Sequence, residues 1–154
     1  ELSGRIIEIT RQKKQLFEGL LRFSQEQSGV LVPEQSGELL DLIDKKQALI
    51  DQINDIDRQA AELEAELHSM VSPSKAGGSE EPAGHREALR VLRGEMFTLL
   101  ERIRQVDEEN KRNATAEHQK AKKEIESLRA RKSTALAYRG TAGQPGGYFL
   151  DTKK

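Results

Sequence analysis

The sequence predicts an all-α protein, an elongated antiparallel bundle or coiled coil of three long helices with a flexible C-terminal tail. Apolar residues recur in steps of three and four along three segments, 33% of the 154 residues are charged, and only 4% are aromatic. This composition supplies solvated helix faces rather than a thick globular core. The predicted division is a helical domain over residues 1–138 and a mobile tail over residues 139–154.

The first helix is expected over residues 2–28. Its apolar stripe, in which the aliphatic stem of one lysine occupies a seam position, comprises Leu2, Ile6, Ile9, Lys13, Leu16, Leu20 and Phe23. Gly29 favours an end at this point, because glycine suits the residue just past a helix. The residue before Pro33 is also biased away from helical angles.

The second helix is expected over residues 34–71, opened by Pro33 in its first turn or by Ser36 as its N-cap. Its seam alternates steps of three and four without a slip, which is typical of a coiled coil. The seam comprises Leu39, Leu42, Lys46, Leu49, Ile53, Ile56, Ala60, Leu63, Leu67 and Met70. Ile43 and Ile50 widen this stripe, so the helix is predicted to contact two neighbours.

Residues 72–84 contain two prolines and three glycines and are expected to form a flexible linker. The third helix is expected over residues 85–138, with a first seam of Leu89, Leu92, Met96, Leu99, Ile103 and Val106. A polar stretch follows, in which Asn110 and Asn113 would continue the seam. A polar seam residue fixes the register of neighbouring helices or leaves a gap for another helix.

The unequal lengths of the three helices predict a surface without a partner. At about 1.5 Å per residue the third helix exceeds the other two, so its distal apolar residues have no obvious intramolecular cover. The predicted binding residues are Ile125, Leu128 and Leu136 on this helix, with Ile43 and Ile50 on the second. In the alternative, the first helix crosses to cover the distal residues or the chain bends back at the polar stretch.

Charge is uneven along the chain. Residues 34–67 hold ten acidic and three basic side chains, whereas residues 111–139 hold nine basic and three acidic ones. The basic segment is predicted either to dock an acidic partner or to be a solvated face that pairs with the acidic second helix. Binding to nucleic acid is not expected, because the segment lacks interleaved stacking aromatics and the net charge of the chain is only −1.

Nothing in the sequence indicates catalysis, so the chain is expected not to be an enzyme. It contains no cysteine, and its histidines, His68, His85 and His118, are not at metal-ligand spacing. No catalytic residue, metal site or cofactor is therefore predicted. No run approaches the roughly 18 apolar residues of a membrane span, and no secretory leader opens the sequence. We expect no membrane insertion and a cytoplasmic location.

Three stretches carry a resemblance to a known family. "LLDLIDKKQALIDQINDID", "LLERIRQVDEEN" and, above all, "ALAYRGTAGQPGGYFLDTKK" resemble the FlgN-like flagellar type III export chaperones, which are pooled with the FliT-like chaperones. The resemblance implies a cytoplasmic, all-helical protein without enzymatic activity. It also implies that the protein holds the helical terminal segment of the hook-associated proteins of the hook-filament junction until they are exported.

The resemblance also implies a docking residue for the membrane export gate. In this family a tyrosine after the long helix, followed closely by glycine, is associated with that docking, and Tyr138 in "AYRGTAG" matches. The additional "GGYFLDTKK" offers Tyr148 and Phe149 as further candidates, which bind a partner, fold back over the client groove or cover an apolar patch of the bundle. The alternatives for the whole chain are a FliT-like chaperone of the filament cap protein and a structural coiled-coil adaptor, the latter a homodimer through the same seams.

Overall fold

A computed structural model describes residues 2–70 and 83–151, with side chains described as far as Gly140. The α-helices are α1 (Leu2–Ser28), α2 (Ser36–Met70) and α3 (Ala83–Asp151), and a 3-10 turn, η1 (Pro33–Gln35), precedes α2. The described ranges contain no strand, so the predicted all-α class is confirmed.

The helix boundaries follow the local signals in the sequence. α1 ends at Ser28 as predicted, and the N–H of Gly29 donates to the carbonyl of Glu26 at 3.1 Å. Pro33 opens η1 and Ser36 begins α2, so each of the two predicted start residues opens an element. The linker predicted for residues 72–84 lies, up to residue 82, outside the described residues.

α3 is longer than the sequence predicted. Its end was expected at Tyr138, but the backbone stays helical to Asp151. The glycines and Pro145 after Tyr138 were the reason for the shorter estimate. Glycine weakens a helix by about 1 kcal/mol per residue but keeps its backbone N–H donor, so it disfavours a helix without ending it. Pro145 lacks this donor and disfavours a helix interior by about 3 kcal/mol, yet the helical backbone continues through it. The flexible tail over residues 139–154 stays a prediction.

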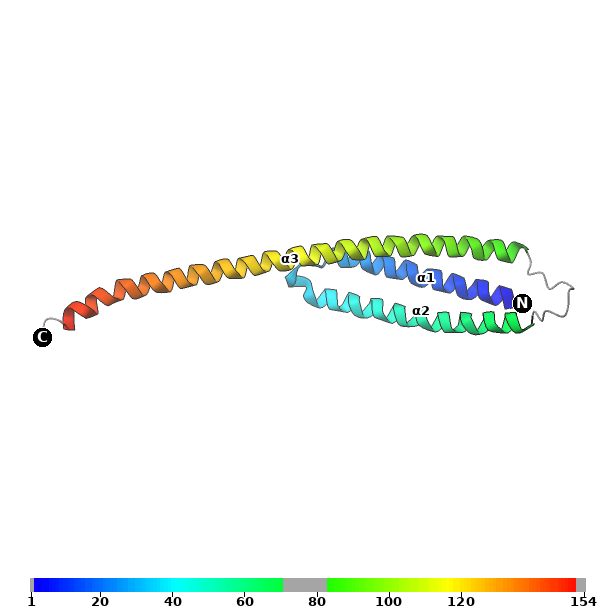
Figure 1. Ribbon diagram of the computed structural model, residues 1–154, viewed down its shortest axis with the longest axis horizontal. Helices are drawn as coiled ribbons and strands as arrows, with labels where there is room; N and C mark the ends of the chain where they lie inside the picture. Colours follow the sequence, from blue (N-terminus) through cyan, green and yellow to red (C-terminus); the bar gives the residue numbers. More distant parts are fainter. Residues whose placement is uncertain (1, 71–82, 152–154) are drawn as a thin grey trace. The chain divides into compact units, whose positions relative to one another are not determined.

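The chain divides into two compact units, Glu1–Asn113 and Ala114–Lys154, which we describe separately. In the first unit α1, α2 and the first part of α3 lie side by side as a three-helix bundle (Figure 1). α1 is parallel to α3, since Ser3 is hydrogen-bonded to His85 at one end and Ser28 to Asn110 at the other. α2 runs antiparallel to both.

Two apolar clusters form the core of the bundle. One contains Ile6, Ile7, Leu63 and Leu89. The other contains Phe17, Leu20, Ile53 and Ile103, with Leu16, Leu21, Leu49, Met96 and Leu99 packed around it. Every seam residue predicted for α2 is at least half-buried except Met70, and the whole first seam of α3 is at least half-buried. The predicted periodicity therefore identified the inward faces of these two helices.

In α1 the apolar spacing predicted only one of two inward stripes. The second stripe is offset from the first by one residue and comprises Ser3, Ile7, Thr10, Lys14, Phe17, Leu21 and Ser24. Its steps also alternate between four and three, but serine, threonine and lysine hide the pattern. The two stripes let α1 pack on α2 and α3 at once. Lys14 on the second stripe forms an ion pair of 2.7 Å with Glu95 of α3, and this hydrogen bond raises the pKa of Lys14.

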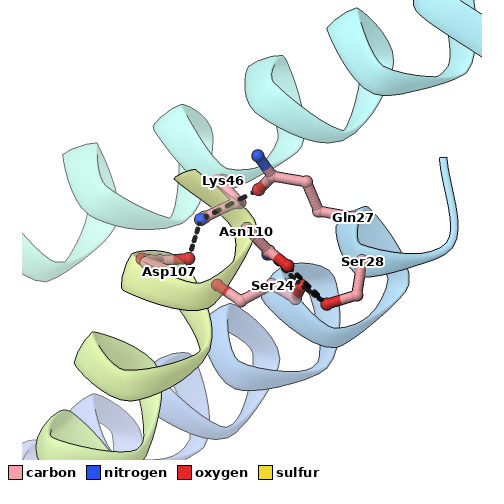
Figure 2. Close-up of polar contacts among 6 residues, drawn as sticks. All are labelled: Ser24, Gln27, Ser28, Lys46, Asp107 and Asn110. Atoms are coloured by element: carbon pink, nitrogen blue, oxygen red, sulfur yellow. Dashed lines mark hydrogen bonds and ion pairs between the residues drawn. The ribbon is translucent and has the colours of Figure 1, made fainter. Parts of the chain in front are cut away.

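A polar layer joins the three helices where the α3 seam reaches Asn110 (Figure 2). The side chain of Asn110 is 2% exposed. Its Nδ2 donates to the carbonyl of Ser24 at 2.8 Å, and its Oδ1 accepts from Ser28 Oγ at 2.6 Å. Beside it, Lys46 of α2 donates to Asp107 at 2.8 Å and to Gln27 at 3.3 Å. Asn110 is therefore hydrogen-bonded between α1 and α3, an arrangement typical of a polar seam residue that fixes register, the first of the two roles expected for it.

Replacing Asn110 with alanine is expected to destabilise the bundle by about 1–3 kcal/mol, because a buried hydrogen-bonded amide is removed from between two helices. Asn113→Ala is the matched control, since Asn113 is exposed and its replacement should change stability by less than about 0.5 kcal/mol. Urea unfolding of the two variants measures both values. Equal stability of the two variants would contradict a register-fixing role for Asn110.

Candidate functional site

Exposed apolar side chains mark the described part of the second unit. Ile125 is 51% exposed, Leu128 is 61% exposed and Leu136 is 57% exposed. Spacings of three and eight residues place these side chains on one face of a helix, which Ala121 extends by a further turn. We call the row Ala121, Ile125, Leu128 and Leu136 the distal stripe. In a soluble protein such an apolar row is normally buried against another helix or sheet, so the distal stripe is a candidate binding surface.

Basic side chains accompany the distal stripe. Residues 114–140 contain seven basic and three acidic side chains. Within the described residues, the ion pairs that join α2 to its neighbours use Lys13, Arg93 and Asp107 of the first unit. Docking of an acidic partner and a solvated face that pairs with α2 both stay predictions for this basic segment.

An open depression lies along one edge of the distal stripe. It is lined by His118, Ala121, Lys122, Ile125, Glu126 and Arg129. Ile125 lies between Lys122 and Arg129 in the sequence, so an apolar side chain and two cationic ones share this surface. Another helix can place an apolar side chain against Ile125 in this depression, and an acidic side chain of that helix would then lie beside Lys122 or Arg129.

Tyr138 lies on a different face of α3. Its side chain is 78% exposed and borders a second depression with Ser127, Ala130, Arg131, Thr134 and Ala135. Tyr138 follows Ile125 by thirteen residues, which at about 100° per residue separates the two side chains by about 140° around the helix. The backbone of Tyr148 and Phe149 belongs to α3, and their side chains lie outside the described residues.

Ile43 and Ile50 of α2 are also exposed, at 44% and 38%. The widened stripe is predicted to contact a second neighbour. α2 does reach both neighbours, through its seam residues in the two apolar clusters and through polar contacts such as Lys46 to Asp107, but the two isoleucines stay exposed. Phe97 and Leu100, which are 67% and 46% exposed on α3, were not among the predicted residues. They fall outside its seam, so periodicity gave no signal for them.

In the part of the chain that the structure describes, no group of three or more histidine, aspartate or glutamate side chains is placed to hold a metal ion. No described helix is both long enough and apolar enough to cross a membrane.

Comparison with known proteins gives one match. The family model described as "FlgN protein" matches residues 2–146, a range that includes the whole bundle, the distal stripe and Tyr138. No curated protein and no solved structure matches the chain.

Proposed function

The chain belongs to the FlgN protein family, a family of flagellar export chaperones, and from this premise we propose that it binds the helical terminal segments of hook-filament junction proteins. In this function the protein acts in the cytoplasm, keeps each segment apart from assembly partners and releases it at the export gate. The protein performs no covalent chemistry on its client.

The exposure of the distal stripe is the observation that carries this function. An amphipathic helix binds to an apolar surface through anchors at helical spacing, and Ile125, Leu128 and Leu136 present such anchors to the solvent. Covering each of them would stabilise a complex by roughly 1.5–3 kcal/mol. The exposed Ile43 and Ile50 of α2 are proposed as a second contact surface for the client.

Calorimetric titration of the full chain with terminal helical segments of the hook-filament junction proteins and of the filament cap protein tests the function. Saturable one-to-one binding to a junction segment is the expected result. Binding only to the cap segment would instead assign the chain to a FliT-like role. No binding to any segment, together with a tight dimer in sedimentation, would support the structural adaptor.

Tyr138 is proposed to dock at the export gate, with Tyr148 and Phe149 as further candidates. Tyr138→Ala is expected to weaken binding to the cytoplasmic domain of the gate by at least tenfold, because an exposed aromatic anchor is removed. Client affinity should stay within about twofold, since Tyr138 and the distal stripe lie on different faces of α3. Pull-down with the gate domain and calorimetry with the client measure the two effects.

The matched variant Tyr148→Ala distinguishes the two tyrosines. Loss of gate binding in Tyr148→Ala, with normal binding in Tyr138→Ala, would move the docking role to the C-terminal end of α3. Equal loss of client binding in both variants would show that neither residue is specific to the gate.

A further inference from the structure

The basic side chains of the second unit differ from those of the bundle in their pairing. In the described part of the first unit, eight basic side chains lie within 4.0 Å of a carboxylate: Arg11, Lys13, Lys14, Lys46, Arg58, Arg90, Arg93 and Arg104. None of those described ion pairs includes Lys122, Arg129 or Lys132. Glu126 lines the same depression as Lys122 and Arg129 and offsets part of their charge, which leaves this edge of the distal stripe net positive.

These cations follow the distal stripe in heptad order. Lys122 and Arg129 are seven residues apart and border Ile125 in the same open depression, so they form one edge of the stripe. Glu117 and Glu124 are also seven residues apart and fall on the opposite edge. Lys132 continues the stripe itself, four residues after Leu128. Charged rows on either side of an apolar seam determine which helix can pair with it and in which orientation.

We infer that the distal stripe selects a client helix with acidic side chains along the edge that faces Lys122 and Arg129 and a further acidic side chain opposite Lys132. This inference rests on the proposed function, because the occupant of the stripe is taken to be its client. The opposite edge of the client then faces Glu117 and Glu124, where basic or neutral side chains fit. The client therefore binds in one orientation.

A second copy of the chain fits this surface only in part. In an antiparallel pair the edge that carries Lys122 and Arg129 faces the same edge of the other copy, which places like charges opposite each other. In a parallel pair Glu117 and Glu124 face Lys122 and Arg129 of the other copy, which is favourable, but the two Lys132 side chains meet across the seam. A client helix with an acidic side chain opposite Lys132 keeps the favourable edge pairs and avoids this repulsion.

Charge reversal with a matched control tests the inference. The variant Lys122→Glu/Arg129→Glu reverses two charges on the edge of the stripe, and Lys120→Glu/Lys123→Glu reverses two charges away from it on the same helix. The probes are the terminal helical segments of the hook-filament junction proteins, titrated into the full-length variants. Circular dichroism checks that both variants keep the helicity of the wild type.

The edge variant is expected to bind about tenfold more weakly than the wild type at about 0.1 M salt, and the control variant within about twofold. At about 1 M salt, where the Debye length is about 3 Å, the difference should vanish. A segment whose acidic row is changed to lysine should regain affinity for the edge variant.

Two results overturn the inference while the proposed function stands. One is binding by the wild type that is insensitive to salt and equal in both variants. The other is a dimer that only the edge variant loses, without a change in client affinity, which assigns the stripe to a second copy. Failure of the wild type to bind any segment overturns the proposed function and the inference with it.

Discussion

Replacing both Ile125 and Leu128 with glutamate is expected to abolish measurable client binding and to leave the helicity of the protein unchanged. Each side chain contributes roughly 1.5–3 kcal/mol if the client covers it. Losing both contributions weakens binding by more than about a hundredfold, since 1.4 kcal/mol is a factor of ten. Both side chains are more than half exposed in the free chain, so the substitutions cost little folding stability.

Calorimetry with the junction segment measures the loss, and circular dichroism checks the fold. Leu40→Glu/Val91→Glu is a matched control, because Leu40 is 62% exposed and Val91 is 44% exposed and neither residue belongs to a proposed surface. Unchanged affinity in the Ile125/Leu128 variant would remove the distal stripe from the client site. An equal loss in the control would show that binding responds to net charge alone.

The same pair of substitutions at Ile43 and Ile50 separates the two proposed surfaces. If the client contacts only the distal stripe, affinity in this variant stays at the wild-type value. A partial loss would extend the client site to α2.

The inward faces of α2 and the first part of α3 were predictable because their seams consist of large apolar residues at unbroken spacing. The second stripe of α1 was not, since Ser3, Thr10 and Ser24 are common on solvated helix faces. Their burial depends on α3 lying directly against α1, a long-range fact that the spacing within α1 does not contain. Local patterns thus predicted the faces that pack by apolar burial and missed the face that packs through small and polar side chains.

At the candidate site the exposed apolar side chains were predicted from the sequence, whereas the arrangement of charge beside them was not. The exposure of Ile125, Leu128 and Leu136 was expected from the unequal helix lengths, and each of these side chains is exposed in the structure. Their role in binding a client stays a prediction. The ordered arrangement of charge beside them is a property of the helix surface, and it became visible only with the depression that joins Lys122, Ile125 and Arg129. Composition alone indicated that the segment is basic, but it did not show on which side of the distal stripe the basic side chains lie.

Replacing Phe17 with alanine is expected to be the most destabilising single change in the bundle. Phe17 lies in the missed stripe of α1, is 7% exposed, and packs with Ile53 of α2 and Ile103 of α3. Removing a buried phenyl ring typically costs about 3–5 kcal/mol, because the lost burial is joined by a cavity that the neighbours fill only in part. A domain stability of roughly 5–15 kcal/mol leaves little after such a loss.

Phe97→Ala provides the control, since it removes the same side chain from a position that is 67% exposed and should change stability by less than about 0.5 kcal/mol. Urea and thermal unfolding compare the two variants, with a decrease in Tm of about 10 °C or more expected only for Phe17→Ala. Equal values would contradict the packing of α1 between α2 and α3. Below its melting temperature, Phe17→Ala should still bind the client through the distal stripe, and a loss of affinity in the folded variant would place part of the client site on the bundle.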